Sequence, residues 1–147
     1  MVLKDKYEQI VQRINDLPID ANPEWGNLTA PKLVAHLIDS MRFAKGEKDL
    51  EIKLSILPKW LLKWLTIYSP MPWPKGIKVP EAFFEHDPRE FAEDKKKLIQ
   101  LIDEYLALPE SHTTDHPLFG KMSKKDWDHL KLRHFKHHFK QFNCPLD

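Results

Sequence analysis

Three histidines lie close together near the end of the chain, His134, His137 and His138, and a fourth, His36, lies among apolar residues much earlier. Imidazole nitrogens are good ligands for zinc, nickel, copper and iron. His134 and His138 are four residues apart, so on a helix they lie one turn apart on the same face and can bind one ion. A third ligand must then come from a facing helix. The spacing therefore predicts a metal site built from at least two helices.

The helix that carries this cluster can be oriented from its apolar residues. Ser123 and Asp126 have the spacing of a capping box, which predicts that a helix begins there. At about 100° per residue, His138 and His134 lie roughly 70° and 110° from the centre of the apolar stripe, and His137 lies roughly 170° from it. The stripe consists of Leu132, Phe135, Phe139 and Phe142. Geometry therefore favours His134 and His138 as the inward pair and predicts that His137 faces solvent.

Two other histidine patterns need separate interpretation. His112 and His116 are also four residues apart, but Pro117 and the polar residues between them predict a non-helical segment. His36 lies between Ala35 and Leu37 in an apolar helical segment, so it must either bond a partner or bind a metal in order to be buried. The residues alone leave these two possibilities for His36 open.

Four or five helices are predicted to position the cluster. Helical periodicity, N-caps and prolines delimit segments 3–17, 30–44, 54–68, 87–108 and 123–142. Thr29 is the expected N-cap of the second helix, and Asp87, followed by Pro88, is the expected N-cap of the fourth. No β alternation or hairpin dipeptide argues for a substantial sheet. The predicted fold is all-α: an antiparallel four-helix bundle with an extra short helix and a proline-rich loop.

Composition bounds the class of protein. The 147 residues are 41% hydrophobic and 31% charged, which predicts one domain spanning residues 1–147 that buries about two-thirds of its unfolded surface. Its 23 Lys and Arg balance 22 Asp and Glu, so the net charge gives no indication of a polyanionic partner. A single cysteine, Cys144, excludes an internal disulfide, and no signal-like apolar run follows Met1. These features predict a cytoplasmic protein.

The segment from Leu54 to Tyr68 is the most apolar, and four prolines follow it between residues 69 and 81. The segment is too short to span a bilayer. Its tryptophans and lysines would suit an interfacial membrane helix, but a buried or dimer-facing helix is the commoner outcome for such a segment. The prolines forbid a helix, so residues 69–81 are expected to wall a pocket or to act as a plain connector.

Two runs of the sequence resemble the DinB-like superfamily, in a branch whose members mostly lack an assigned function. The runs are PEWGNLTAPKLVAHLIDS, with Trp25, Gly26, Thr29 and His36, and HPLFGKMSKKDWDHLKLRHFKHHFKQF, with His116, Pro117, Phe119, Gly120, Trp127, His134, His138 and Gln141. The resemblance spans nearly the whole chain. It implies a four-helix bundle, often dimeric, in which one histidine of the second helix and two of the last hold a divalent metal. Carried onto this sequence, these ligands are His36, His134 and His138.

Three neutral imidazoles leave the charge of the ion uncompensated and a coordination position open, the pattern of catalytic zinc sites. Zinc and nickel both suit this ligand set. The resemblance adds thiol-dependent transfer, isomerisation or conjugation as the expected chemistry, with a low-molecular-weight thiol as a substrate. Asp39, one turn after His36, is interpreted either as an orienting group or general base, or as an exposed surface carboxylate. The residues expected to line or support the pocket are Trp25, Trp73, His116, Trp127, His137 and Gln141.

Three functional hypotheses follow. The first is a metal-dependent enzyme, a transferase or hydrolase acting on a small molecule. The second is a metal-binding module without catalysis, such as a sensor or a store. The third is nucleic-acid binding through the last helix, because residues 121–140 hold seven Lys and Arg against two Asp. A basic C-terminal turn also complements the helix dipole, which makes this third hypothesis the weakest.

Overall fold

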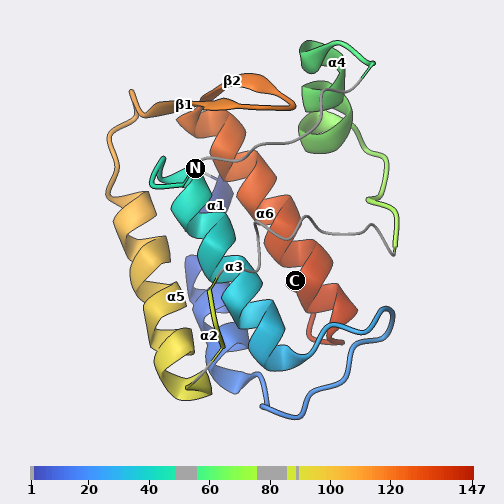
Figure 1. Ribbon diagram of the computed structural model, residues 1–147, viewed down its shortest axis with the longest axis vertical. Helices are drawn as coiled ribbons and strands as arrows, with labels where there is room; N and C mark the ends of the chain where they lie inside the picture. Colours follow the sequence, from blue (N-terminus) through green and yellow to red (C-terminus); the bar gives the residue numbers. More distant parts are fainter. Residues whose placement is uncertain (1, 49–55, 76–85, 89) are drawn as a thin grey trace.

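The computed structural model describes residues 2–48, 56–75, 86–88 and 90–147. Figure 1 shows how its elements follow one another along the chain. In order they are α1 (Val2–Asp5), α2 (Tyr7–Asp16), α3 (Ala30–Ala44), α4 (Lys59–Lys63), the π-helix η1 (Trp64–Tyr68), α5 (Phe91–Leu106), β1 (Thr113–His116), β2 (Gly120–Ser123) and α6 (Lys124–Gln141).

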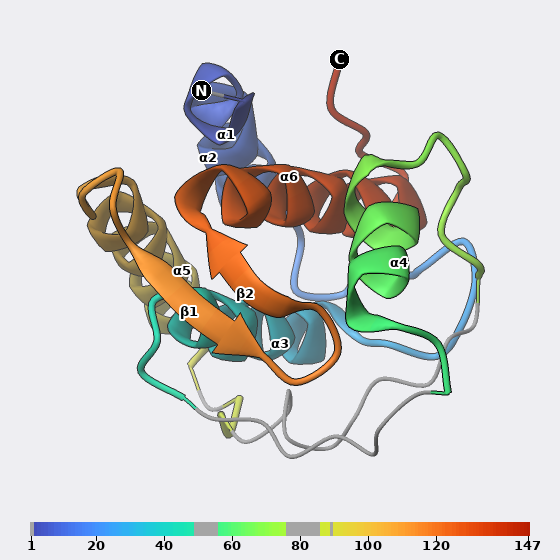
Figure 2. The same ribbon diagram turned by 90° about the horizontal axis from the view of Figure 1, so that it is seen from above.

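The long helices α3, α5 and α6, together with α1 and α2, enclose the hydrophobic core. Helix α3 packs mainly on α5, whereas α1 packs on α6. The β1–β2 hairpin lies across one end of these helices, and α4 stands beside α6 on the side away from α5 (Figures 1 and 2). The largest side chains with almost no exposure include Trp127, Tyr105, Phe135, Phe139 and Met41. One face of α6 thus packs in the core, and loops cover another face.

The prediction of an all-α four-helix bundle is wrong. The described residues are 57% helical, with six α-helices and a two-stranded antiparallel sheet. The strands pair from Thr113↔Ser123 to His116↔Gly120. Three residues connect them, and Gly120 then adopts a φ of +75°, so the turn is not the two-residue type that a hairpin dipeptide indicates. The first strand, TTDH, has no apolar alternation, and periodicity therefore could not reveal it.

Two predicted helix starts are confirmed. Thr29 caps α3 by accepting a hydrogen bond from the backbone of Lys32 at 3.3 Å, and the helix occupies residues 30–44 as expected. Ser123 and Asp126 form the predicted capping box at the start of α6, with bonds of 2.9 and 3.1 Å. Local side-chain bonding thus fixes where both histidine-bearing helices begin, and with it the position of the histidines along them.

The predicted start of the fourth helix is wrong. Helix α5 begins at Phe91, with Glu90 at its N-cap and no side-chain cap bond, so Asp87 lies outside it. His86, the residue before Asp87, explains why the helix starts later than predicted. Its backbone N–H donates to Asp39 on α3 at 2.9 Å. This bond ties the chain to α3 before the helix can start. The first predicted helix is likewise interrupted, at Lys6, into α1 and α2.

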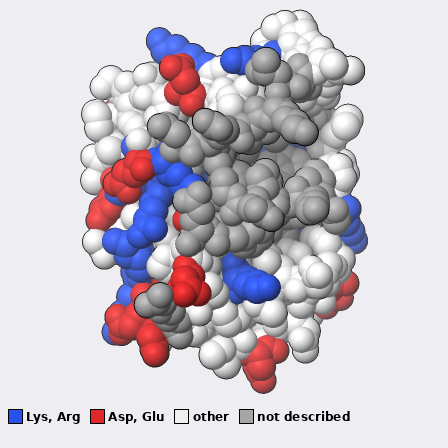
Figure 3. Space-filling model, in the orientation of Figure 1, with Lys and Arg blue, Asp and Glu red and all other residues white. Residues whose placement is uncertain are grey.

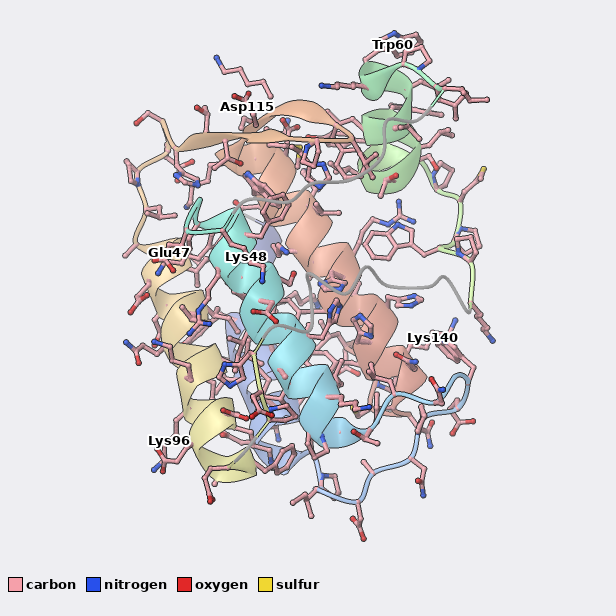
Figure 4. All side chains as sticks on the ribbon, viewed as in Figure 1. Glu47, Lys48, Trp60, Lys96, Asp115 and Lys140 are labelled. Carbon is pink, nitrogen blue, oxygen red and sulfur yellow. The ribbon has the colours of Figure 1, made fainter. Side chains whose placement is uncertain are left out.

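The apolar segment does not form one buried helix. Within its described part, residues 56–68, a helix starts only at Lys59 and changes to a π-helix at Trp64, and Ile67 alone is buried. Trp60 is 71% exposed and lies at the outer end of α4 (Figure 4). Among the described residues, no helix combines the length and the apolar character needed to cross a membrane. Residues 69–75 are non-helical as expected, and the remainder of the proline-rich stretch, with Leu54, lies outside the described residues.

Candidate metal centre

Three imidazoles from two helices converge between α3 and α6. His36 of α3 and His134 and His138 of α6 each offer one ring nitrogen, and these atoms all lie within 4.8 Å of one another. His134 Nε2 lies 2.9 Å from His36 Nε2 and 3.0 Å from His138 Nε2. Nitrogen ligands of a tetrahedral zinc ion are about 3.3 Å apart. The three histidines could therefore hold a metal ion.

Gln141 fixes the orientation of His138. The Gln141 side-chain NH₂ donates to the backbone carbonyl of Trp25 at 3.1 Å, and its oxygen lies 2.8 Å from His138 Nδ1. A carbonyl can only accept, so the amide must present its nitrogen to Trp25 and its oxygen to His138. His138 Nδ1 must then carry the proton, which leaves a lone pair on Nε2. That lone pair points at the other two histidines.

A proton count shows what such a cluster requires. A neutral imidazole has one N–H and one lone pair. His138 presents a lone pair to His134 Nε2, so a hydrogen bond between them needs a proton on His134 Nε2. The same proton cannot also form the hydrogen bond of the 2.9 Å contact between His134 and His36. If the proton were absent from His134 Nε2, the lone pairs of His134 Nε2 and His138 Nε2 would face each other. With neutral rings one contact is always mismatched, whereas a divalent cation satisfies all three nitrogens at once.

Ser40 and Lys131 support His134 at Nδ1, the ring nitrogen that does not face the other two histidines. Ser40 Oγ lies 3.2 Å from His134 Nδ1, and the Lys131 ammonium donates to Ser40 Oγ and, at 3.0 Å, to the Ser40 carbonyl. Both residues are buried. When His134 binds a metal through Nε2, its Nδ1–H donates to this hydroxyl, where a carboxylate or a carbonyl is more usual. Lys131 is not among the residues predicted from the sequence, although its spacing from Phe135 and His138 places it on the buried face of α6.

The electrostatics keep two histidines of the cluster, His134 and His138, neutral. Burial first, and then the neighbouring imidazoles and Lys131, lower the pKa of His134 well below its ordinary value. Burial lowers the pKa of His138 to about 4, and burial lowers the pKa of Lys131 to about 7. Metal binding requires unprotonated imidazole. At neutral pH, His134 and His138 are therefore already in the form that binds a cation.

The prediction that His137 faces solvent is wrong. His137 is half-buried, with Trp25 and Trp73 each 5.6 Å from it between ring centroids, and it also touches His138. The two tryptophans belong to the loops before α3 and after η1. These loops cover the face of α6 that a simple bundle would leave open. His137, Trp25 and Trp73 therefore lie beside the cluster, as does Gln141.

Trp127 on α6 and His116 at the end of β1, also predicted to line the pocket, lie together, with ring centroids 6.0 Å apart. Trp127 is fully buried and its indole N–H donates to Thr114 at 2.9 Å. His116 stacks on Phe119 with centroids 4.1 Å apart, and its Nδ1 accepts from the backbone N–H groups of Leu118 and Phe119. Among the described residues, the Trp127 bond joins the hairpin to α6 and the His116 bonds close its turn, and neither set orients a histidine of the cluster.

Asp39 is not the exposed carboxylate that one interpretation expected, because it is only 1% exposed. It accepts from the backbone of His86 at 2.9 Å and lies 3.5 Å from the ammonium of Lys48. Among the described residues its bonds join α3 to the segments before α5 and after α3. Its use as a general base stays a prediction, and the hydrogen bonds it makes are structural ones.

Replacing Lys131 with methionine is expected to tighten zinc binding by about tenfold at pH 6. The charge on Lys131 already lowers the pKa values of His134 and His138, so it also opposes a divalent ion. Methionine has a similar length and tolerates burial. Competition with a chromophoric chelator would measure the affinity, with the exposed Lys125→Met as the matched control.

The gain in zinc affinity from Lys131→Met should shrink at pH 8.5, where Lys131 is already neutral. Weaker binding in Lys131→Met would instead mean that Lys131 acts mainly by positioning Ser40.

The comparison with protein families gives one match. A family model described as a protein of unknown function, DUF1569, matches residues 5–144. No curated protein and no solved structure matches the chain. The matched region contains all three histidines of the cluster together with Ser40, Lys131 and Gln141.

Proposed function

The chain belongs to the DUF1569 family, whose function is unknown, and from the site itself we propose that it is a metal-dependent enzyme acting on a small molecule at the three-histidine cluster. The observation that carries this proposal is the convergence of three imidazole nitrogens from α3 and α6. Structural zinc sites are closed by four protein ligands, whereas three ligands and an open position are typical of catalytic sites. Zinc or nickel suits the donor set.

The chain's own residues prepare the site for such chemistry. A bound divalent ion would supply an electrophilic centre that can activate water or a thiol near neutral pH. Gln141 holds His138 in the tautomer that leaves Nε2 free, and Ser40 is placed to accept the Nδ1 proton of His134. His36 and His138 are buried, but His134 is partly exposed. Solvent access at His134 marks the side from which a substrate would reach the open position.

The resemblance to DinB-like proteins supports a more specific version of this proposal. It favours a low-molecular-weight thiol as one substrate, in a transfer reaction. Hydrolysis is the other reaction type, because a bound ion would activate water. The resemblance also favours a homodimer. The exposed apolar side chains of residues 56–71, among them Trp60 and Trp64, would suit such an interface.

Nucleic-acid binding through α6 is less well supported. Of its basic residues, Lys124 and Lys131 are buried. Arg133 donates to the backbone carbonyls of Thr66, Ser69 and Met71. On the described part of the face in Figure 3, the Lys and Arg side chains have Asp and Glu side chains beside them. A non-catalytic metal sensor or store uses the same histidines and is the stronger alternative.

Zinc- or nickel-loaded protein is expected to accelerate the reaction of a small thiol with 1-chloro-2,4-dinitrobenzene, or the hydrolysis of p-nitrophenyl acetate. The acceleration should disappear after treatment with a chelator and return when the metal is added back, because the open position is where the thiol or water is activated. Initial rates at pH 7.5 would measure it. Stoichiometric metal without turnover across a wider panel of thiols, electrophiles and esters would favour the sensor or store.

A further inference from the structure

Aromatic rings continue outward from the exposed side of the metal cluster. The Trp73 ring lies 6.1 Å from His134 and 5.6 Å from His137 between centroids. The Trp25 ring also lies 5.6 Å from His137, at an interplanar angle of 64°. Both tryptophans are only partly buried, as is His134. The rings of Trp73, His137 and Trp25 therefore form a partly exposed aromatic surface that begins next to His134. We call Trp73, His137 and Trp25 the aromatic rim.

Trp73 is held in place by α6 and the π-helix. Its indole N–H donates to the carbonyl of Thr66 at 2.8 Å. The guanidinium of Arg133, one residue before His134, lies 5.4 Å from the Trp73 ring centroid and also donates to Thr66 at 2.8 Å. A second Arg133 bond, to the carbonyl of Ser69 at 3.0 Å, fixes the start of the loop that carries Trp73. The position of the ring is thus set by the same helix that carries two of the histidine ligands.

Trp25 is held by a different set of contacts from the same helix. Its carbonyl accepts from Gln141, the residue that orients His138, and the backbone N–H of Glu24 donates to the Gln141 carbonyl at 2.6 Å. Gly26 follows with a φ of +73°, and a Cβ there would lie 3.4 Å from the Gln141 side chain. Lys75 lies 4.7 Å from the Trp25 ring centroid. Two separate loops therefore present their indole rings to His137, which is next to the cluster.

We propose that the aromatic rim binds a flat aromatic group of the ligand whose donor atom occupies the open coordination position beside His134. The inference rests on the proposed function and adds a class of substrate to it, an aromatic or other planar apolar compound with a metal-binding head. Indole and imidazole rings favour stacked or edge-to-face contact with another ring, beyond what burial of apolar area alone contributes. Rings that are fixed beforehand lose little conformational freedom when a ligand binds.

A pair of probes with the same metal-binding head would test the proposal. Acetohydroxamate and benzohydroxamate differ by a methyl against a phenyl group, and titration of the cobalt-loaded protein by its visible absorption would give both dissociation constants. We expect benzohydroxamate to bind about tenfold more tightly than acetohydroxamate, from ring contact and apolar burial. In Trp73→Leu, and independently in Trp25→Leu, the ratio should fall to about threefold or less while acetohydroxamate affinity changes little.

Controls separate the rim from the rest of the protein. Trp60→Leu removes an exposed tryptophan on α4 and should leave the ratio unchanged. Unaltered cobalt stoichiometry and acetohydroxamate affinity would show that the site of each rim variant is intact, and the two variants lie on different loops. Equal affinity of the two probes for the wild type, or an unchanged ratio in both rim variants, would overturn this inference alone. Failure of the wild type to bind cobalt or acetohydroxamate would overturn the proposed function as well.

Discussion

Replacing His134 and His138 together with alanine is expected to reduce the bound transition metal from about one equivalent per chain to near zero. The two residues supply two of the three ring nitrogens that lie within 4.8 Å of one another. A single remaining imidazole, His36, cannot retain an ion against water and buffer. Elemental analysis of untagged protein, before and after incubation with zinc or nickel and removal of excess metal, would measure the change. His36→Ala should show the same loss, because it removes the only ligand of the cluster from α3.

The same helix offers matched controls. His129 lies on α6 and contacts Tyr68, with ring centroids 5.2 Å apart, so His129→Ala should retain the metal. His137→Ala should also retain it, since the His137 ring packs against two tryptophans instead of joining the cluster. Full metal content in the double variant would contradict the ligand assignment. Loss of the metal from His137→Ala with a normal circular dichroism spectrum would require a different ligand set.

The parts of the site that could be predicted are those governed by local rules. Caps at Thr29 and Ser123 locate α3 and α6, and the helical period then places His134 and His138 one turn apart. These rules depend on side chains within a few positions of each other, so they act before any tertiary structure is considered. They place the histidines on helices, but only packing could bring His36 next to them.

The parts that could not be predicted depend on contacts between distant segments. His137 is covered because the loops with Trp25 and Trp73 lie over α6, and Lys131 is buried because it reaches Ser40 on α3. The hairpin escaped detection for a local reason, because its strands are short and polar and Gly120, instead of a two-residue turn, closes the connection. Asp87 failed as a cap because the neighbouring His86 is tied to Asp39. Each discrepancy traces to a specific long-range bond or to a turn without a recognised sequence signature.

Lowering the pH from 7 to 5 is expected to destabilise the metal-free protein by at least about 4 kcal/mol. Burial and, to a lesser extent, Lys131 lower the pKa of His116 to about 3, burial lowers the pKa of His138 to about 4, and burial and neighbouring charges lower the pKa of His134 well below its usual range. Between the unfolded value near 6.5 and these native values, the unfolded chain binds protons that the native protein does not. Stability therefore rises with pH and is lost as pH falls below about 6.5. By pH 5 the loss is about 2 kcal/mol each for His116 and His138, and His134 adds to it in the same direction.

This loss is comparable with the whole stability of a typical domain, about 5–15 kcal/mol, so the metal-free protein should unfold cooperatively near pH 5 or slightly below. Urea unfolding followed by circular dichroism at pH 7.5, 6 and 5 would measure the slope. His116→Asn keeps a side-chain acceptor for the backbone N–H groups of Leu118 and Phe119 without a titrating ring, and should remove about 2 kcal/mol of the loss between pH 7 and 5. Zinc should raise stability at pH 7.5 and lose this effect by pH 5, because the protons that unfold the protein compete with the ion for His134 and His138. A free energy of unfolding that stays constant from pH 7.5 to 5 would mean that these imidazoles are not buried in neutral form.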